Sequence, residues 1–315
     1  LGAATAPLFL VRLETPLHGL AVPVLACVAG VGASALLLRA HALPGTAFAL
    51  VVALLGLVVR LGLNTAQHGT AEWARPFLRG GGTREYPAAF PLVDHLGVHG
   101  FIDRFGTFTG SPDFPVHPAG HPVGATLAAW GLDRLGGGVE GLALLVIALG
   151  ALGAVPVLLL ARRLLDERDA RVATLLFALA PATLVHGATS LDGIFVPVAA
   201  LCAWAVLARR HATAALLAGG GFLLTYAFAL VPLWAALALG RRGVVRAALV
   251  TAGGALALLA VLALLAGYDP LDALRGTFTA YERGIGGRRP HAYWLLGGPA
   301  AFLLALGPGV ALLLL

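Results

Sequence analysis

Runs of about 20 apolar residues follow one another along most of this chain. A run of that length is sufficient to cross the hydrocarbon core of a bilayer as a helix. Only 11% of the residues are charged and 59% are hydrophobic, whereas about a quarter of the residues are charged in average soluble domains. The sequence therefore predicts an integral membrane protein of the all-α class, folded as a polytopic transmembrane helical bundle.

One segment between the predicted spans is expected to turn back on itself. Ala212–Leu239 is too long for a comfortable single crossing and is flanked by arginines at both ends, which favours a hairpin of two short helices. We expect residues 1–315 to form a single transmembrane domain. The sequence starts without methionine and stops in an apolar run, so the presence of further helices beyond either end is left open. The predicted single crossings are Leu17–Leu38, Pro44–Leu63, Leu142–Ala161, Val172–Val185, Ile194–Leu207, Val244–Leu265 and Tyr293–Leu314.

Two longer segments carry too many charges to lie in hydrocarbon. Residues 64–137 mix apolar and polar positions in the way of short helices lying in the membrane interface. Residues 268–292 are rich in arginine and aromatic residues. Short arginine-rich loops elsewhere in the chain are expected in the cytoplasm, and counting crossings from them places both segments on the outer face. The carboxylates of the first segment include Glu72, Glu85, Asp94, Asp103 and Asp113.

The arginines of the second segment run against the tendency of basic residues to stay inside. Such a local exception is expected where function demands it. Guanidinium groups match phosphate oxygens in charge and geometry, so Arg288 and Arg289 suit a lipid phosphate or pyrophosphate. Nonspecific contact with anionic headgroups is the alternative. The net charge of +6 does not indicate nucleic-acid binding, because the arginines gather at the ends of hydrophobic segments.

The stretch "DFPVHPAGHPVG", residues 113–124, joins the first polar segment to an apolar one. His117 and His121 have the spacing of a helical metal pair, but the prolines beside them remove backbone donors and prevent a regular helical face. Metal binding is disfavoured further because no carboxylate or cysteine set lies at ligand spacing. We expect Pro122 to start a helix. The prolines then fix the chain where it re-enters the membrane and hold imidazoles that can donate to phosphate oxygens.

The order of these pieces resembles the membrane glycosyltransferases of the GT-C class, such as dolichyl-phosphate-mannose mannosyltransferases and lipid A aminoarabinose transferases. The resemblance lies in "REYPAAF" (84–90), "VHPAGHPVG" (116–124), the predicted hairpin, and "RRPHAYWLLGGPAAFLLALGP" (288–308). It extends over most of the chain beyond Pro44, and its specificity lies in the order of short motifs. The span before Pro44 is additional to the simplest family pattern. The hairpin has Thr225 and Tyr226 where many relatives carry a lysine.

The resemblance implies an inverting transferase that takes sugars from polyprenyl phosphates at the outer face of a bacterial plasma membrane. Transfer requires a base for the acceptor's proton, while the lipid phosphate leaves as a stable anion. By resemblance Glu85 is the expected base, with Asp94 and Asp103 as rivals. A glycan, lipid or protein acceptor is implied, in contact with membrane lipids. No metal ligand is assigned, and dependence on a divalent cation stays open, since relatives differ. The expected substrate-binding residues are Tyr86, His117, His121, Tyr226, Arg288, Arg289 and His291.

Two other functional classes stay open from the sequence. A transporter or flippase of a lipid-linked or anionic substrate would show repeated halves and charged or broken helices near the bilayer midplane, whereas the charges here concentrate in the outer segments and no repeat is evident. A noncatalytic membrane protein could have the same hydropathy but has no need of a carboxylate, a rigid histidine turn and opposing arginines. In "TSLDG", Ser190 or Asp192 is expected to cap the following helix, and contact of Asp192 with the acceptor is the less favoured role.

Overall fold

A computed structural model describes residues 20–39, 43–78, 85–240, 242–284 and 286–288, together with positions 295, 299, 303 and 307. All regular elements within these ranges are helices, which confirms the predicted all-α class. Among the described residues, four helices are long and apolar enough to cross a membrane, and the number is five if a bent pair of helices is counted as one span. The chain is a membrane protein by this criterion.

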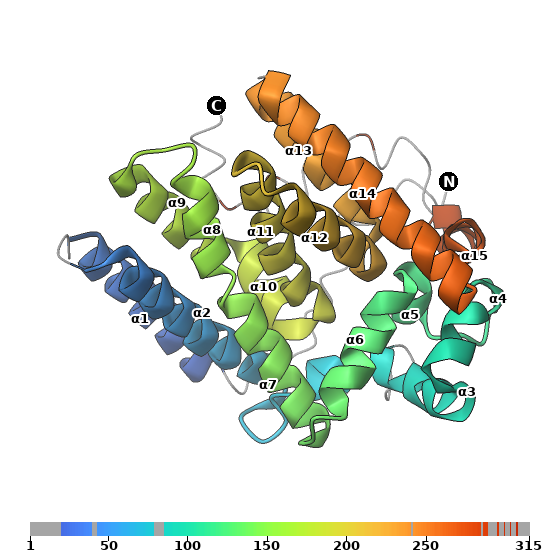
Figure 1. The fold of residues 1–315 in the computed structure, drawn as a ribbon. Helices are drawn as coiled ribbons and strands as arrows, with labels where there is room; N and C mark the ends of the chain where they lie inside the picture. Colours follow the sequence, from blue (N-terminus) through green and yellow to red (C-terminus); the bar gives the residue numbers. More distant parts are fainter. Residues whose placement is uncertain are drawn as a thin grey trace.

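The first long helices form one side of the bundle. α1 (Ala21–Arg39) and α2 (Gly45–His68) pack side by side at one edge of the view in Figure 1. α7 (Gly138–Ala151) and α8 (Ala154–Ala161) together make the next span, and both contact α2. These helices agree with the predicted crossings to within a few residues.

The following span is bent. α9 (Glu167–Leu179) and α10 (Pro181–Thr189) meet at an angle of 49°. Pro181 lacks an amide hydrogen and disfavours helical geometry in the residue before it, and Ala180 accordingly has ψ of 136°. α10 packs against α2 and α7 beyond the bend.

The predicted hairpin is confirmed. α12 (His211–Leu224) is followed by a 3-10 turn, η4 (Tyr226–Ala229), and by α13 (Leu230–Leu239). Both helices pack against α14 (Arg242–Ala266) and against α11 (Phe195–Leu207), which follows the 3-10 turn η3 (Leu191–Ile194). The last predicted crossing, Tyr293–Leu314, lies outside the described residues except for four single positions.

Short helices occupy the polar segment between α2 and α7. After α14, α15 (Pro270–Arg283) and the 3-10 turn η5 (Gly286–Arg288) follow. α15 packs against two helices of the first polar segment, α4 (Phe105–Thr109) and α5 (Val116–Gly120). Figure 1 shows this group gathered at one end of the molecule. The short helices of the first segment are η1 (Arg75–Leu78), η2 (Tyr86–Ala89), α3 (Phe90–Asp103), α4 (Phe105–Thr109), α5 (Val116–Gly120) and α6 (Val123–Asp133).

Glycine allows α4 and α15 to touch. A Cβ on Gly276 of α15 would collide with the Thr109 hydroxyl, and a Cβ on Gly106 of α4 would collide with the Asp272 carboxylate. Beneath this contact, the rings of Phe101 and Phe105 are fully buried in an aromatic cluster. The two polar segments, far apart in sequence, are therefore one packed unit.

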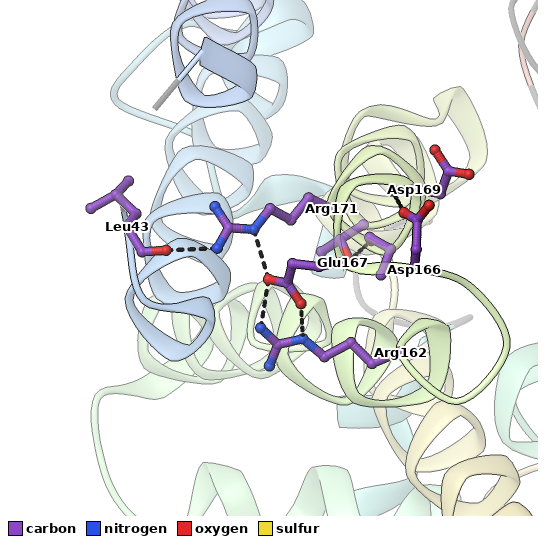
Figure 2. A network of polar contacts seen from close by, with 8 residues as sticks. Leu43, Arg162, Asp166, Glu167, Asp169 and Arg171 are labelled. Atoms are coloured by element: carbon purple, nitrogen blue, oxygen red, sulfur yellow. Dashed lines mark hydrogen bonds and ion pairs between the residues drawn. The ribbon is translucent and has the colours of Figure 1, made fainter. Parts of the chain in front are cut away.

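An ion-pair network holds together the opposite, arginine-rich ends of the helices (Figure 2). Glu167 accepts hydrogen bonds from Arg162 at 2.7 Å and from Arg171 at 2.8 Å. Arg171 also donates to the backbone carbonyl of Leu43 at 2.6 Å, just before α2 begins. At the far end of α2, the Asn64 amide donates to the carbonyl of Ala188 at 2.6 Å. The start of α2 thus lies with the α8–α9 turn, and its end lies near the polar segments.

We predict that Glu167→Gln lowers protein stability by about 0.5–1 kcal/mol, the range of a well-formed exposed ion pair. Hydrogen bonds from Arg162 and Arg171 lower the pKa of Glu167 from 4.5 to about 2. The stabilising effect is therefore complete above pH 4.5 and is lost as the pH falls towards 2. Thermal unfolding of the detergent-solubilised protein at pH 7 and pH 3.5 measures this. Asp113→Asn, at an exposed position without an ion pair among the described residues, is the control; an equal loss in both variants would contradict the prediction.

Candidate functional site

A carboxylate and an imidazole meet at the start of the short helices. Glu85 immediately precedes η2, and His117 lies on α5. Glu85 Oε2 is 2.7 Å from His117 Nδ1. The Glu85 side chain is only 6% exposed, whereas that of His117 is 41% exposed. A buried carboxylate requires such a partner, because an isolated charge away from water is strongly unfavourable.

Prolines explain why both residues are held in place. Pro87 occupies the first turn of η2, and Pro115 immediately precedes α5. Proline fixes its own φ angle and suits the beginning of a helix. α6 begins at Val123 immediately after Pro122, which confirms the predicted helix start. The histidine-proline stretch is consequently a rigid turn.

Tyr86 packs beside both histidines of that turn. Its ring centroid lies 6.4 Å from that of His117 and 6.1 Å from that of His121. The Tyr86 hydroxyl is buried and has no hydrogen-bond partner among the described residues. Burial raises the pKa of Tyr86 well above 10, and the negative charges of Asp192 and Glu85 raise it further. The hydroxyl therefore stays neutral and keeps a hydrogen-bond donor that no described residue uses.

His121 connects the turn to the hairpin and to the start of α11. Its Nδ1 is 3.3 Å from the carbonyl of Leu224, which can only accept, so this nitrogen carries the hydrogen. Its Nε2 faces Asp192 Oδ1 at 3.6 Å, and its ring packs on Phe195 at 5.3 Å between centroids. Burial lowers the pKa of His121, while Asp192 and the Leu224 carbonyl act in the opposite direction.

Asp192 faces a cavity. The capping role predicted for this region belongs to Ser190, whose hydroxyl accepts from the Asp192 amide at 3.2 Å. The Asp192 carboxylate is 44% exposed and lines an open cavity of about 500 Å³, whose wall is formed by residues of α2, α7, α9, α10, η3, α11, η4 and α13. Phe195 lines the same cavity. The cavity thus lies directly beside the histidine turn.

The structure brings four predicted site residues together, namely Glu85, Tyr86, His117 and His121. The hydroxyl of Tyr226 lies 3.3 Å from that of Thr277, which joins the hairpin to α15. The backbone of Arg288 belongs to η5, but its side chain lies outside the described residues, as do Arg289 and His291. In the described part of the chain, no three histidine, cysteine, aspartate or glutamate side chains cluster as metal ligands.

The rival carboxylate Asp94 has structural partners. Trp130 Nε1 donates to it at 2.9 Å, and Arg134 pairs with it. These contacts lower the pKa of Asp94, with the Trp130 hydrogen bond as the largest cause. Asp94 thereby ties α3 to α6 at an exposed position, away from the Glu85–His117 contact.

Sequence reasoning missed two polar residues of α2. Arg60 lines the cavity, and Asn64 lies one turn further along. Neither residue was assigned a role from the sequence. The positive charge of Arg60 could have identified it, because an ionisable residue within a transmembrane segment is expected to be functional.

No protein-family model, no curated protein and no solved structure matches this chain. The function must therefore be inferred from the residues and their geometry.

We predict that the protein loses stability as the pH falls through 6.5, and that His121→Gln reduces this loss. Burial holds the folded-state pKa of His121 below its ordinary value of 6.5. Below that pH the unfolded chain binds the proton more readily, so acid favours unfolding. Melting temperatures between pH 5 and pH 8 test this, with the exposed His99→Gln as the control. If His99→Gln flattens the profile as much as His121→Gln, the effect does not come from His121.

Proposed function

We propose that the protein is a membrane glycosyltransferase of the GT-C class that moves a sugar from a polyprenyl phosphate to an acceptor. The observation that carries this proposal is the Glu85–His117 contact of 2.7 Å beside a cavity lined by Asp192. A buried carboxylate oriented against an exposed imidazole is an arrangement suited to accepting a proton. The resemblance of the motifs in the histidine-proline stretch to that class supports the same conclusion.

The outer face of a bacterial plasma membrane is the proposed location of the reaction. Arg162 and Arg171 lie at one end of the bundle, together with the start of α2. The positive-inside rule places that end in the cytoplasm. The short helices and α15 lie at the other end of the spans. In this proposal they face the outside of the cell and use a lipid-linked sugar there.

In this proposal Glu85 and His117 act as one proton-accepting unit. Glu85 is nearly buried, so the more exposed His117 is the member that an acceptor hydroxyl can approach. Glu85 orients the imidazole and stabilises its protonated form, as a carboxylate does for a catalytic histidine elsewhere. As the proton leaves the acceptor, its oxygen attacks the anomeric carbon, and the bond to the lipid phosphate breaks. Attack opposite the leaving phosphate inverts the configuration.

The other proposed residues bind rather than react. The Tyr86 hydroxyl, buried without a partner in the described ranges, can donate to the acceptor or donor. His121 and Tyr226 border the same region through their contacts with Asp192 and Thr277. Arg288, Arg289 and His291 remain predicted to bind the substrate or donor. A glycan, lipid or protein acceptor and a divalent cation as activator are compatible with this arrangement.

We predict that Glu85→Gln and His117→Gln each reduce sugar transfer about 10²- to 10⁴-fold, the usual contribution of a general base. Membranes containing the protein are supplied with a radiolabelled polyprenyl-phosphate sugar, and label in the acceptor fraction is counted. Asp113→Asn is the matched control and should retain full activity. Full transfer by Glu85→Gln would exclude the catalytic assignment, and movement of the labelled lipid across the membrane without transfer would favour a flippase.

We also predict opposite accessibilities for the two ends of the bundle. In a variant with Cys27→Ala, a membrane-impermeant maleimide applied to intact cells should label Ser111→Cys but leave Arg168→Cys unlabelled. Permeabilised cells should show labelling at both positions. The reverse pattern in intact cells would place the candidate site in the cytoplasm.

A further inference from the structure

Arg60 is a charged residue in the middle of an apolar helix. It lies on α2 and is only 1% exposed. No carboxylate of the described chain forms an ion pair with it, and its Nε has no hydrogen-bond partner there. Nη1 makes one long contact, 3.4 Å from the carbonyl of Ile147. A buried charge with so little compensation is strongly unfavourable and indicates a missing anionic partner.

The surroundings of the Arg60 side chain are built from glycine. A Cβ on Gly187 would lie 3.0 Å from Arg60 Nε, and a Cβ on Gly150 would lie 3.4 Å from Nη1. Gly193 packs in turn on Gly187. These three glycines come from α10, α7 and η3, and all three line the cavity of about 500 Å³ that Arg60 also lines. Glycine at these positions therefore lets the helix backbones approach the guanidinium group closely, where a side chain would crowd it.

The rest of the cavity divides into a polar and an apolar part. Asp192 and His186 are the other ionisable residues in its lining. Most of the remaining wall is apolar, including Phe177, Val196, Ala199, Phe228 and Val231. A simple inorganic anion would match Arg60 but leave this apolar surface uncovered.

An apolar groove adjoins the cavity. Ala199 of α11 and Val231 of α13 belong to both. The groove has a volume of about 270 Å³ and extends past Leu160 and Ala203 to Trp234. Because α11 and α13 both run towards the arginine-rich end, the groove follows the helices into the depth of the membrane. A hydrocarbon chain fits this lining.

We propose that the cavity binds an amphiphile whose phosphate lies on Arg60 and whose apolar chain follows the groove between α11 and α13. A guanidinium fork matches phosphate oxygens, and burial strengthens that contact because little water competes. The Asp192 carboxylate then faces the part of the ligand nearest to the histidine turn. Naming an isoprenoid phosphate as this amphiphile rests on the proposed glycosyltransferase function, whereas binding itself requires no turnover.

Binding of farnesyl phosphate, farnesol and inorganic phosphate to the purified protein tests this inference without any sugar. Wild type should bind farnesyl phosphate at least about tenfold more tightly than either farnesol or inorganic phosphate. Arg60→Gln should abolish the preference over farnesol, and Arg60→Lys should retain part of it. Arg163→Gln is the control. Arg163 is an exposed arginine just after α8, outside the cavity lining, so this variant should bind as wild type does.

A second variant tests the path of the chain. Ala199→Phe fills the junction of cavity and groove without changing any charge, and it should weaken farnesyl phosphate binding at least about tenfold. Equal binding of farnesyl phosphate and farnesol by wild type, or an unchanged preference in Arg60→Gln, would overturn the phosphate assignment. Binding of inorganic phosphate as tight as that of farnesyl phosphate, or unchanged binding by Ala199→Phe, would overturn the groove.

Stability separates a binding role of Arg60 from a structural one. An uncompensated buried charge destabilises the ligand-free protein, so Arg60→Gln should melt no lower than wild type. A lower melting temperature with the phosphate preference intact would assign Arg60 to folding alone. If sugar transfer is absent in wild type while this binding pattern holds, the glycosyltransferase proposal fails and the phosphate site stands.

Discussion

The high free-energy cost of placing a charge in hydrocarbon determines where the charged residues of this protein lie. Charges are sorted to the two ends of the apolar helices, where water or partners can compensate them. At one end Glu167 neutralises arginines and ties the start of α2 to the α8–α9 turn. At the other end, carboxylates and histidines lie on short helices that do not cross the membrane. Arg60 is the exception within the described part of α2, which is why it is informative.

The candidate site depends on contacts between segments that are distant in sequence. Glu85 and His117 come from one polar segment, while Leu224 and Asp192 come from the hairpin and the start of α11. The histidine turn is the common element, since its prolines restrict the backbone and its two rings reach different neighbours. α15 closes the arrangement by packing on α4 and α5. A rigid turn held on several sides is a suitable place for chemistry that needs fixed geometry.

Much of the fold could be predicted because apolar length and helix-breaking residues are local properties of the sequence. The spans, the hairpin between two arginine pairs and the helix start after Pro122 follow from such local signals. The family resemblance suggested separate roles for Glu85 and His117, but their contact was not predicted. The partners of Asp192 and the glycine surroundings of Arg60 could not be predicted, because they depend on how α2, α7, α10 and α11 pack. A single sequence does not specify which side chains meet across such interfaces.

The bend at Pro181 has a consequence for the shape of the interior. Beyond it, α10 leans towards α2 and presents Ala182, Thr183 and Gly187 to the cavity. A straight helix would send these residues along the axis of α9 and away from that position. The bend that the pyrrolidine ring of Pro181 introduces thus helps to shape the cavity, while the residues in its wall determine what it binds.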